Sequence, residues 1–248
     1  MYMNKFRPRI TGAFLCLLCF SRITFAGEYA VASAHPLATN AGLEILQQGG
    51  NAFDAAIAVT STLAVVEPYS SGIGGGGFYL LHRQRDDFQV MLDARERAPL
   101  KSHRDMYLNA DGSVNHDWSM NGATSAGIPG IPAAVHHLQQ HYGDLPLEQT
   151  LARAIKYAEQ GFEVDRIYRR MAKFRLEVLQ RYESSREILL RDGEIPDPGS
   201  LIKQPDLAQT LRLLAEQGRE GFYQGEVAQM LVDSVQAHGG IWSKQDLK

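Results

Sequence analysis

The spacing of apolar residues near the start of the chain predicts a short strand followed by two helices. The stretch at 29–33 is continuously apolar or small, as in a buried strand. From Pro36 onward the apolar positions take helical spacing until Gly49-Gly50, which ends that helix. Asn51 is a preferred helix cap. The alanine-rich stretch 52–66 that follows it predicts a buried helix that other elements can approach closely.

Two further apolar stretches predict a pair of antiparallel strands. Residues 78–81 alternate poorly and predict a central strand, and 88–92 follow after the turn signal Asp86-Asp87. The glycine-rich segment 72–77 precedes the first strand. A phosphate-binding loop follows a strand and opens a helix, whereas this segment follows a helix and opens a strand. We therefore expect its glycines to allow positive φ angles and close backbone packing.

The rest of the chain is loop-rich at first and then helical. Turn signals run from Arg95 to Gly130, and Pro129 and Pro132 open the next helix. Apolar residues at helical spacing predict helices over 133–142, 147–160, 165–182, 206–217 and 225–238. Strands early and helices late indicate an α+β fold or a layered sandwich rather than alternating βαβ units, and no linker divides two domains.

The first residues have the pattern of a signal peptide over 1–26. Basic residues precede an apolar run at 12–20, and small residues then lead to a cleavage site after Ala26. The run is shorter than the roughly 20 apolar residues of a permanent membrane anchor. The sequence therefore predicts an exported protein, periplasmic or secreted, with no permanent membrane anchor and a mature chain of residues 27–248.

Charge and cysteine content disfavour several classes of protein. The 248 residues carry 25 Lys and Arg against 28 Asp and Glu, a formal charge of −3 at pH 7, so no strong cationic field attracts nucleic acid. Cys16 and Cys19 both lie in the predicted signal peptide. The mature chain is therefore expected to have no disulfide, thiolate metal site or cysteine nucleophile. Lipid attachment at Cys19 is a second interpretation, which the large Leu18 before it disfavours.

Histidines provide the first candidate chemistry. His137 and His141 have the spacing that places two imidazoles on one helix face, and His136 lies beside them. No third ligand is indicated, so we expect a solvated helix face and no metal or other cofactor. His35, before Pro36, is a candidate base, although a structural hydrogen bond at a strand end is the expected role.

Arg95 is the sharper candidate. It lies in Asp93-Ala94-Arg95-Glu96-Arg97, directly after a predicted strand. A guanidinium at this position can hold a carboxylate through two parallel hydrogen bonds, at roughly 1.5–3 kcal/mol for bonds to charged groups. Internal pairing with Asp93 or Glu96 is the alternative, and the charge pattern by itself favours that alternative.

Several motifs occur in one order at close spacing, and the ordered set is specific. They are Ser33-Ala34-His35-Pro36-Leu37-Ala38-Thr39, Gly49-Gly50-Asn51-Ala52-Phe53-Asp54-Ala55-Ala56, Gly74-Gly75-Gly76-Gly77-Phe78, Asp93-Ala94-Arg95-Glu96-Arg97-Ala98-Pro99, Gly127-Ile128-Pro129-Gly130 and Gly221-Phe222-Tyr223-Gln224-Gly225. With them the chain resembles the γ-glutamyltransferase (glutathione hydrolase) family over nearly its whole mature length.

The resemblance implies an N-terminal-nucleophile hydrolase with an αββα sandwich, made as a precursor that cuts itself into a large and a small subunit. The family moves the γ-glutamyl group of glutathione and other γ-glutamyl compounds to water or to an amino-acid or peptide acceptor. The amino-terminal threonine of the small subunit attacks the amide carbonyl, and backbone N–H groups stabilise the oxyanion. Arg95 falls on the family's arginine that binds the α-carboxylate of the donor.

The resemblance covers only the first portion of the large subunit. No threonine here lies in the Thr-Thr-His-Tyr-like context of the nucleophile, so we expect no catalytic residue in this chain and an incomplete αββα sandwich with exposed apolar faces. The expectation is a fragment of an exported enzyme, inactive alone, whose partner is a small subunit that carries the nucleophile. Alternatives are a non-catalytic remnant or partner subunit, a related cephalosporin acylase or poly-γ-glutamate-processing enzyme, and an exported protein that captures anionic amino acids.

Overall fold

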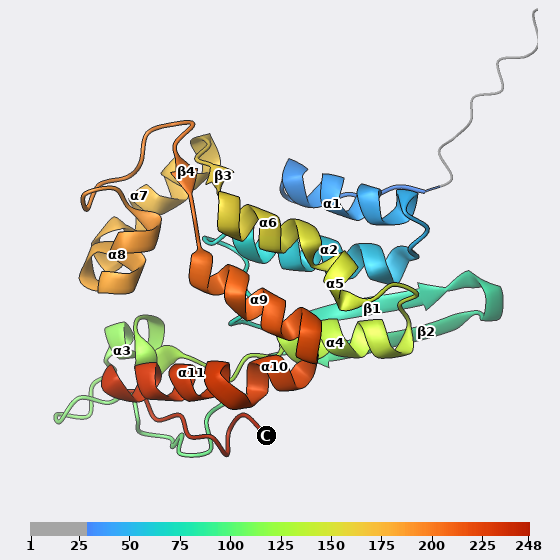
Figure 1. The fold of residues 1–248 in the computed structure, drawn as a ribbon. Coiled ribbons are helices and arrows are strands. Elements are labelled where there is room, and N and C mark those ends of the chain that lie inside the picture. Colours follow the sequence, from blue (N-terminus) through green and yellow to red (C-terminus); the bar gives the residue numbers. More distant parts are fainter. Residues whose placement is uncertain (1–28) are drawn as a thin grey trace, which may run out of the picture. The chain divides into compact units, whose positions relative to one another are not determined.

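The computed structural model describes residues 29–248, of which Val31–Lys248 form one compact unit (Figure 1). The predicted signal peptide and both cysteines lie outside the described residues. The helices are α1 (Pro36–Gln47), α2 (Ala52–Val66), α3 (His116–Met120), α4 (Ile131–His141), α5 (Leu147–Thr150), α6 (Ala152–Gln160), α7 (Arg166–Arg181), α8 (Glu183–Leu189), α9 (Pro205–Gln217), α10 (Arg219–Tyr223) and α11 (Gly225–Ala237).

The strands of the described residues form two small antiparallel sheets. Strand β1 (Gly77–Arg83) pairs with β2 (Phe88–Ala94), and β3 (Phe162–Glu163) pairs with β4 (Leu201–Ile202). The fold is thus mixed and mostly helical, and the α+β prediction is confirmed at that level. None of the helices within residues 29–248 is both long enough and apolar enough to span a membrane.

Side chains cap the first two helices, and the cap at Asn51 is the one that the sequence predicts. His35 caps α1, where its Nδ1 accepts the N–H of Leu37 at 3.2 Å. Asn51 caps α2, where its Oδ1 accepts the N–H of Phe53 at 2.7 Å. The carboxylate of Asp54 accepts the N–H of Asn51 in return, at 2.9 Å, which completes a capping box. These contacts satisfy amides that have no partner inside the helix.

Helix α2 lies at the centre of the core. Its residues Ile57, Val65 and Val66 are almost completely shielded from solvent. Helices α1, α4 and α6 pack around it, and α9 packs against α6 (Figure 1). Burial of each large aliphatic side chain contributes about 1.5–3 kcal/mol, so this packing holds together segments that are far apart in the sequence.

The β1–β2 hairpin has one covered face and one exposed face. Tyr79 and Leu81 point to the covered face, whereas Leu80 is 81% exposed and lies opposite Met91, which is 61% exposed. The prediction of a central strand is therefore wrong for the described residues, where β1 pairs with β2 alone. The prediction arose because β1 has apolar residues on both faces, a pattern typical of burial on both faces. Among the described residues only one of these faces is covered.

Two other sequence expectations differ from the structure. Residues 29–33 form no strand, because no described segment supplies the backbone partner that a strand requires. The predicted helix 147–160 is divided into α5 and α6 at Leu151, whereas the helix predicted over 165–182 is confirmed as α7. Short elements such as α3, α10, β3 and β4 carry too few periodic positions to be recognised from spacing.

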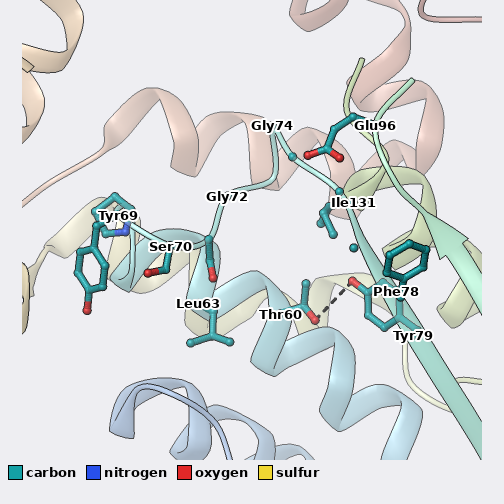
Figure 2. Close-up of a pocket in the computed structure, with 15 residues that line it drawn as sticks. Thr60, Leu63, Tyr69, Ser70, Gly72, Gly74, Phe78, Tyr79, Glu96 and Ile131 are labelled. Atoms are coloured by element: carbon teal, nitrogen blue, oxygen red, sulfur yellow. Dashed lines mark hydrogen bonds between the residues drawn. The ribbon is translucent and has the colours of Figure 1, made fainter. Parts of the chain in front are cut away.

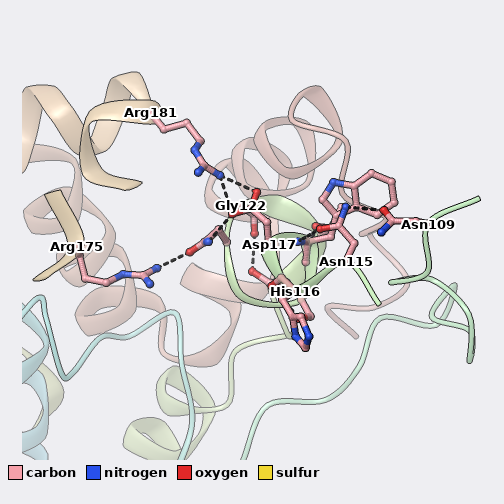
Figure 3. A network of polar contacts seen from close by, with 12 residues as sticks. Asn109, Asn115, His116, Asp117, Gly122, Arg175 and Arg181 are labelled. Atoms are coloured by element: carbon pink, nitrogen blue, oxygen red, sulfur yellow. Dashed lines mark hydrogen bonds and ion pairs between the residues drawn. The ribbon is translucent and has the colours of Figure 1, made fainter. Parts of the chain in front are cut away.

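The loop-rich region between β2 and α4 is tied to α7 by polar contacts (Figure 3). The carboxylate of Asp117 accepts hydrogen bonds from Arg181 at 2.7 and 2.9 Å, and Arg175 donates to Asn121. The hydrogen bonds that Asp117 accepts from Arg181 and from Asn121 lower its pKa below the ordinary value, with the Arg181 bond as the largest cause. Asn115 caps α3 within the same network. The network gives the region a defined path although it has little regular structure.

Candidate functional site

Arg95 follows the last residue of β2, and its backbone is held on both sides. The Asp93 carboxylate accepts the Arg95 N–H at 2.9 Å. Two residues later, Arg97 and Ile128 exchange backbone hydrogen bonds of 3.2 and 2.8 Å. The segment that carries Arg95 is therefore fixed between the end of the hairpin and the approach to α4.

Glycines allow neighbouring backbone segments to pack closely against the segment that carries Arg95. A Cβ on Gly76 would lie 2.6 Å from the Ala94 oxygen, and one on Gly130 would lie 2.1 Å from the same atom. A Cβ on Gly127 would lie 2.9 Å from the Cβ of Glu96. Real Cβ atoms do not approach this closely, so glycines are required on both sides of the segment that carries Arg95.

The prediction for the glycine-rich segment is confirmed in one part and wrong in the other. Close backbone packing occurs, and the segment runs from α2 into β1, which is opposite to the order of a phosphate loop. None of the glycines in 72–77 has a positive φ angle. The segment is held instead by Gly75, whose carbonyl accepts the N–H groups of Gly130 and Ile131 at 2.9 and 3.2 Å.

Gly76→Ala is expected to lower the free energy of unfolding by about 1–3 kcal/mol, because the added methyl group must displace the Ala94–Glu96 backbone. Gly74→Ala is the matched control in the same segment, since a Cβ there has nothing within 4 Å. The control should change stability by less than about 0.5 kcal/mol. Urea unfolding of both variants measures the difference, and equal midpoints would contradict the packing argument.

The Arg95 side chain combines an internal ion pair with free donors. Its Nε donates to Glu96 Oε2 at 3.1 Å, and its guanidinium carbon lies 5.9 Å from the centre of the Phe78 ring. The side chain is nevertheless 63% exposed, and its terminal nitrogens have no hydrogen-bond partner among residues 29–248. Internal pairing therefore occurs as the charge pattern favours, and it leaves the terminal nitrogens of the guanidinium available for a carboxylate.

A groove of about 550 Å³ lies beside this segment (Figure 2). The glycine-rich segment and Glu96 form one side, and Thr60 and Tyr79 lie on another, where the Tyr79 hydroxyl donates to Thr60 at 3.4 Å. Burial raises the pKa of Tyr79. Tyr69 also lines the groove, and burial with the nearby charge of Glu67 raises its pKa to about 12. Both phenols therefore stay protonated at neutral pH and can donate hydrogen bonds rather than act as bases.

The candidate histidines lie on α4 and at the start of α1. His137 and His141 lie on one face of α4 with ring centres 4.2 Å apart, and His136 precedes them. Within residues 29–248 no group of three or more His, Cys, Asp or Glu has the arrangement of a metal site. His35 makes the structural hydrogen bond that was expected, at a helix start rather than a strand end, and burial lowers its pKa.

Sequence reasoning proposed Arg95 as a candidate but did not predict the residues that position its segment. Gly127 and Gly130 were recognised only as parts of a motif, although each leaves no room for a Cβ against the 94–97 segment. Tyr223 was likewise recognised only within a motif, and its buried hydroxyl donates to the Pro129 oxygen at 2.7 Å. A Gly-x-x-Gly pair directly before a helix that opens with proline was the available signal.

Comparisons with known proteins agree on one family. A family model described as Gamma-glutamyltranspeptidase matches residues 38–248. The crystal structure of Helicobacter pylori gamma-glutamyltranspeptidase is 38% identical, with a TM-score of 0.87 over 91% of this chain and 64% of that chain. A cephalosporin acylase from Bacillus halodurans is 31% identical, with a TM-score of 0.75 over 91% of this chain and 45% of that chain.

Curated relatives give the same result and show how much of them is matched. The glutathione hydrolase proenzyme of Pseudomonas sp. (strain A14) is 39% identical over 222 residues, which are 88% of this chain and 38% of the relative. The Escherichia coli (strain K12) proenzyme is 37% identical over 90% of this chain and 38% of its own length. The chain therefore spans about two fifths of the length of these relatives.

Proposed function

This chain belongs to the gamma-glutamyltranspeptidase family, and we propose that it forms the N-terminal part of the large subunit of an enzyme that hydrolyses or transfers the γ-glutamyl group of glutathione. Other γ-glutamyl compounds are further donors, and water, amino acids or peptides are the acceptors. Residues 1–26 act as a signal peptide, so the enzyme works in the periplasm or outside the cell.

Arg95 binds the α-carboxylate of the donor in this proposal. The observation that carries it is the exposed guanidinium at the end of β2, with one nitrogen paired to Glu96 and two terminal nitrogens free among the described residues. The glycine packing fixes the backbone that carries Arg95, and the Glu96 contact holds one nitrogen of its side chain before a ligand arrives. Such preorganisation lowers the entropic cost of binding.

The nucleophile comes from a part of the enzyme outside this sequence. A threonine hydroxyl oxygen bonds to the γ-carbonyl carbon, the amide C–N bond breaks, and the hydroxyl proton passes through the threonine amine to the leaving nitrogen. Water or an acceptor amine then takes the acyl group from the resulting ester. The exposed apolar face around Leu80 and Met91 supports an incomplete αββα sandwich, which further strands of the enzyme would cover.

A related acylase is the second candidate, favoured by the shared fold with the Bacillus halodurans cephalosporin acylase. Two donors distinguish the candidates in the enzyme that contains this chain: γ-glutamyl-p-nitroanilide and 4-aminobutyryl-p-nitroanilide, which lacks only the α-carboxylate. The proposed function predicts at least about 100-fold higher kcat/KM for the first donor. Equal rates would contradict the proposed function and favour an acylase that does not recognise an α-carboxylate.

The purified chain alone is expected to release no p-nitroaniline from γ-glutamyl-p-nitroanilide above a heat-killed control, because its proposed nucleophile lies elsewhere. Turnover that resists repeated purification would disprove this expectation. Co-purification of a second polypeptide, followed by activity of the pair, would support the partner-subunit arrangement. An assembled pair that binds the donor without turnover would instead indicate a non-catalytic remnant.

A further inference from the structure

A second cleft lies on the other side of the segment that carries Arg95. It has a volume of about 620 Å³ and is enclosed by the end of β2, by α4 and by α10. Its lining is rich in groups that carry or can accept positive charge, namely Arg95, Arg97, His136, His137, His141 and Arg219. Asp93 is the acidic residue of this lining, and its carboxylate already accepts the Arg95 N–H. The chain as a whole is acidic, so this local excess of cations is unusual.

The positive charge of Arg97 has no ion-pair partner among the described residues. Its side chain is exposed and forms no ion pair or hydrogen bond with any residue in 29–248. Its backbone is nonetheless fixed by the two hydrogen bonds to Ile128. An arginine on a fixed backbone with all its side-chain donors free is suited to bind an anion.

Arg219 brings a second guanidinium to the same cleft from α10. Its guanidinium carbon lies 4.6 Å from the centre of the Tyr223 ring, and one terminal nitrogen donates to the Lys248 oxygen at 2.9 Å. Burial raises the pKa of Tyr223, and the charges of Arg219 and Arg97 both oppose that rise. Arg219 from α10 and Arg97 from the segment after β2 thus line the same cleft.

The imidazoles of α4 line the wall of the cleft. Burial lowers the pKa of His136, and the charges of Arg219 and His141 lower it further. Burial also lowers the pKa of His137, with His141 and His136 adding to the effect. Like charges that lower one another's proton affinity are stabilised when an anion binds between them.

We propose that this cleft binds a small doubly charged anion, either a tetrahedral oxyanion or a dicarboxylate, between Arg97, Arg219 and the imidazoles of α4. Two guanidinium groups match the charge of a dianion, and each can present a planar pair of N–H donors to two oxygens. The site needs no nucleophile and is tested through Arg97 rather than Arg95, so its failure is distinguishable from failure of the proposed function. Arg95 lines the edge of the cleft, while its Nε remains paired with Glu96.

Binding is expected to strengthen as the pH falls. The groups that face the site are Asp93, Arg95 and Arg97 after β2, the three histidines of α4, and Arg219 and Tyr223 of α10. The arginines stay charged and Tyr223 stays neutral across the neutral range, so the pH dependence comes from the imidazoles of His136 and His137, whose pKa values burial lowers. A bound anion raises their pKa, and by linkage the anion then binds better where they are protonated.

Calorimetric titration of the purified chain with sodium sulfate and with sodium succinate tests the proposal. Sodium chloride holds the ionic strength constant at about pH 6 and at about pH 8, a range in which sulfate remains a dianion. We expect saturable binding with one site per chain, about tenfold weaker at the higher pH. Tighter sulfate binding identifies an oxyanion site, and tighter succinate binding identifies a dicarboxylate site.

Arg97→Gln should weaken binding about tenfold, because it removes a charged donor without touching the backbone bonds to Ile128. Arg104→Gln is the matched control, since Arg104 is 96% exposed and does not line the cleft. NMR titration of the imidazoles is the second measurement, and sulfate should raise the lowered pKa values of His136 and His137. Absent saturation, equal weakening by both variants, or unchanged histidine titration would overturn the proposal.

Discussion

Arg95→Ala in the enzyme that contains this chain should lower kcat/KM for γ-glutamyl-p-nitroanilide by about 100-fold or more. Two hydrogen bonds from a guanidinium to a carboxylate are lost, at roughly 1.5–3 kcal/mol each. The fold should survive, because the side chain is 63% exposed and its backbone contacts do not depend on the guanidinium. Circular dichroism and urea unfolding check that point.

Further variants separate recognition of the α-carboxylate from a general loss of charge. Arg95→Lys should retain part of the activity, because an ammonium keeps the charge but lacks the planar pair of donors. Arg104→Ala removes an exposed arginine outside both clefts and should have no effect. The penalty of Arg95→Ala should nearly vanish with 4-aminobutyryl-p-nitroanilide. The same penalty with both donors would show that Arg95 does not contact the α-carboxylate.

Local signals predicted the start of the fold well. The cap at Asn51, the start of α1 at Pro36, the glycines that end α1 and the apolar spacing of α2 all act within a few residues, so they can be read from the sequence. The hairpin register likewise follows from the turn between β1 and β2. Burial of β1 depends on which segments lie against it in space, and that information is not local. For this reason the prediction of a central strand failed.

The sequence offered one candidate residue for the site but not its arrangement. Arg95 is a candidate because its charge follows a strand directly within a recognisable motif. The packing of Gly76, Gly127 and Gly130 against the 94–97 segment joins three separate segments of the chain. The cationic cleft likewise combines Arg97 with residues of α4 and α10. Such a cluster has no sequence period and becomes visible only when the chain is folded.

Asp54→Ala is expected to lower the free energy of unfolding by about 3–5 kcal/mol. The carboxylate of Asp54 is completely shielded from solvent and accepts N–H groups from three residues, Asn51, Asp144 and Leu145, at 2.9 to 3.2 Å. It therefore caps α2 and also holds the turn that follows α4. Removing it leaves several amides without an acceptor in a place that water does not reach, and each such loss costs about 1–3 kcal/mol.

Urea unfolding measures this effect against Asp111→Ala. Asp111 also accepts a backbone N–H, from Ser113 at 2.9 Å, but it is exposed, so water replaces the lost contact. The control should therefore change stability by less than about 0.5 kcal/mol. Asp54→Asn should fall between the two, because the amide keeps one oxygen acceptor but turns an N–H donor toward the donors that remain. If Asp54→Ala and Asp111→Ala unfold at the same urea concentration, the buried carboxylate does not hold α2 to the turn after α4.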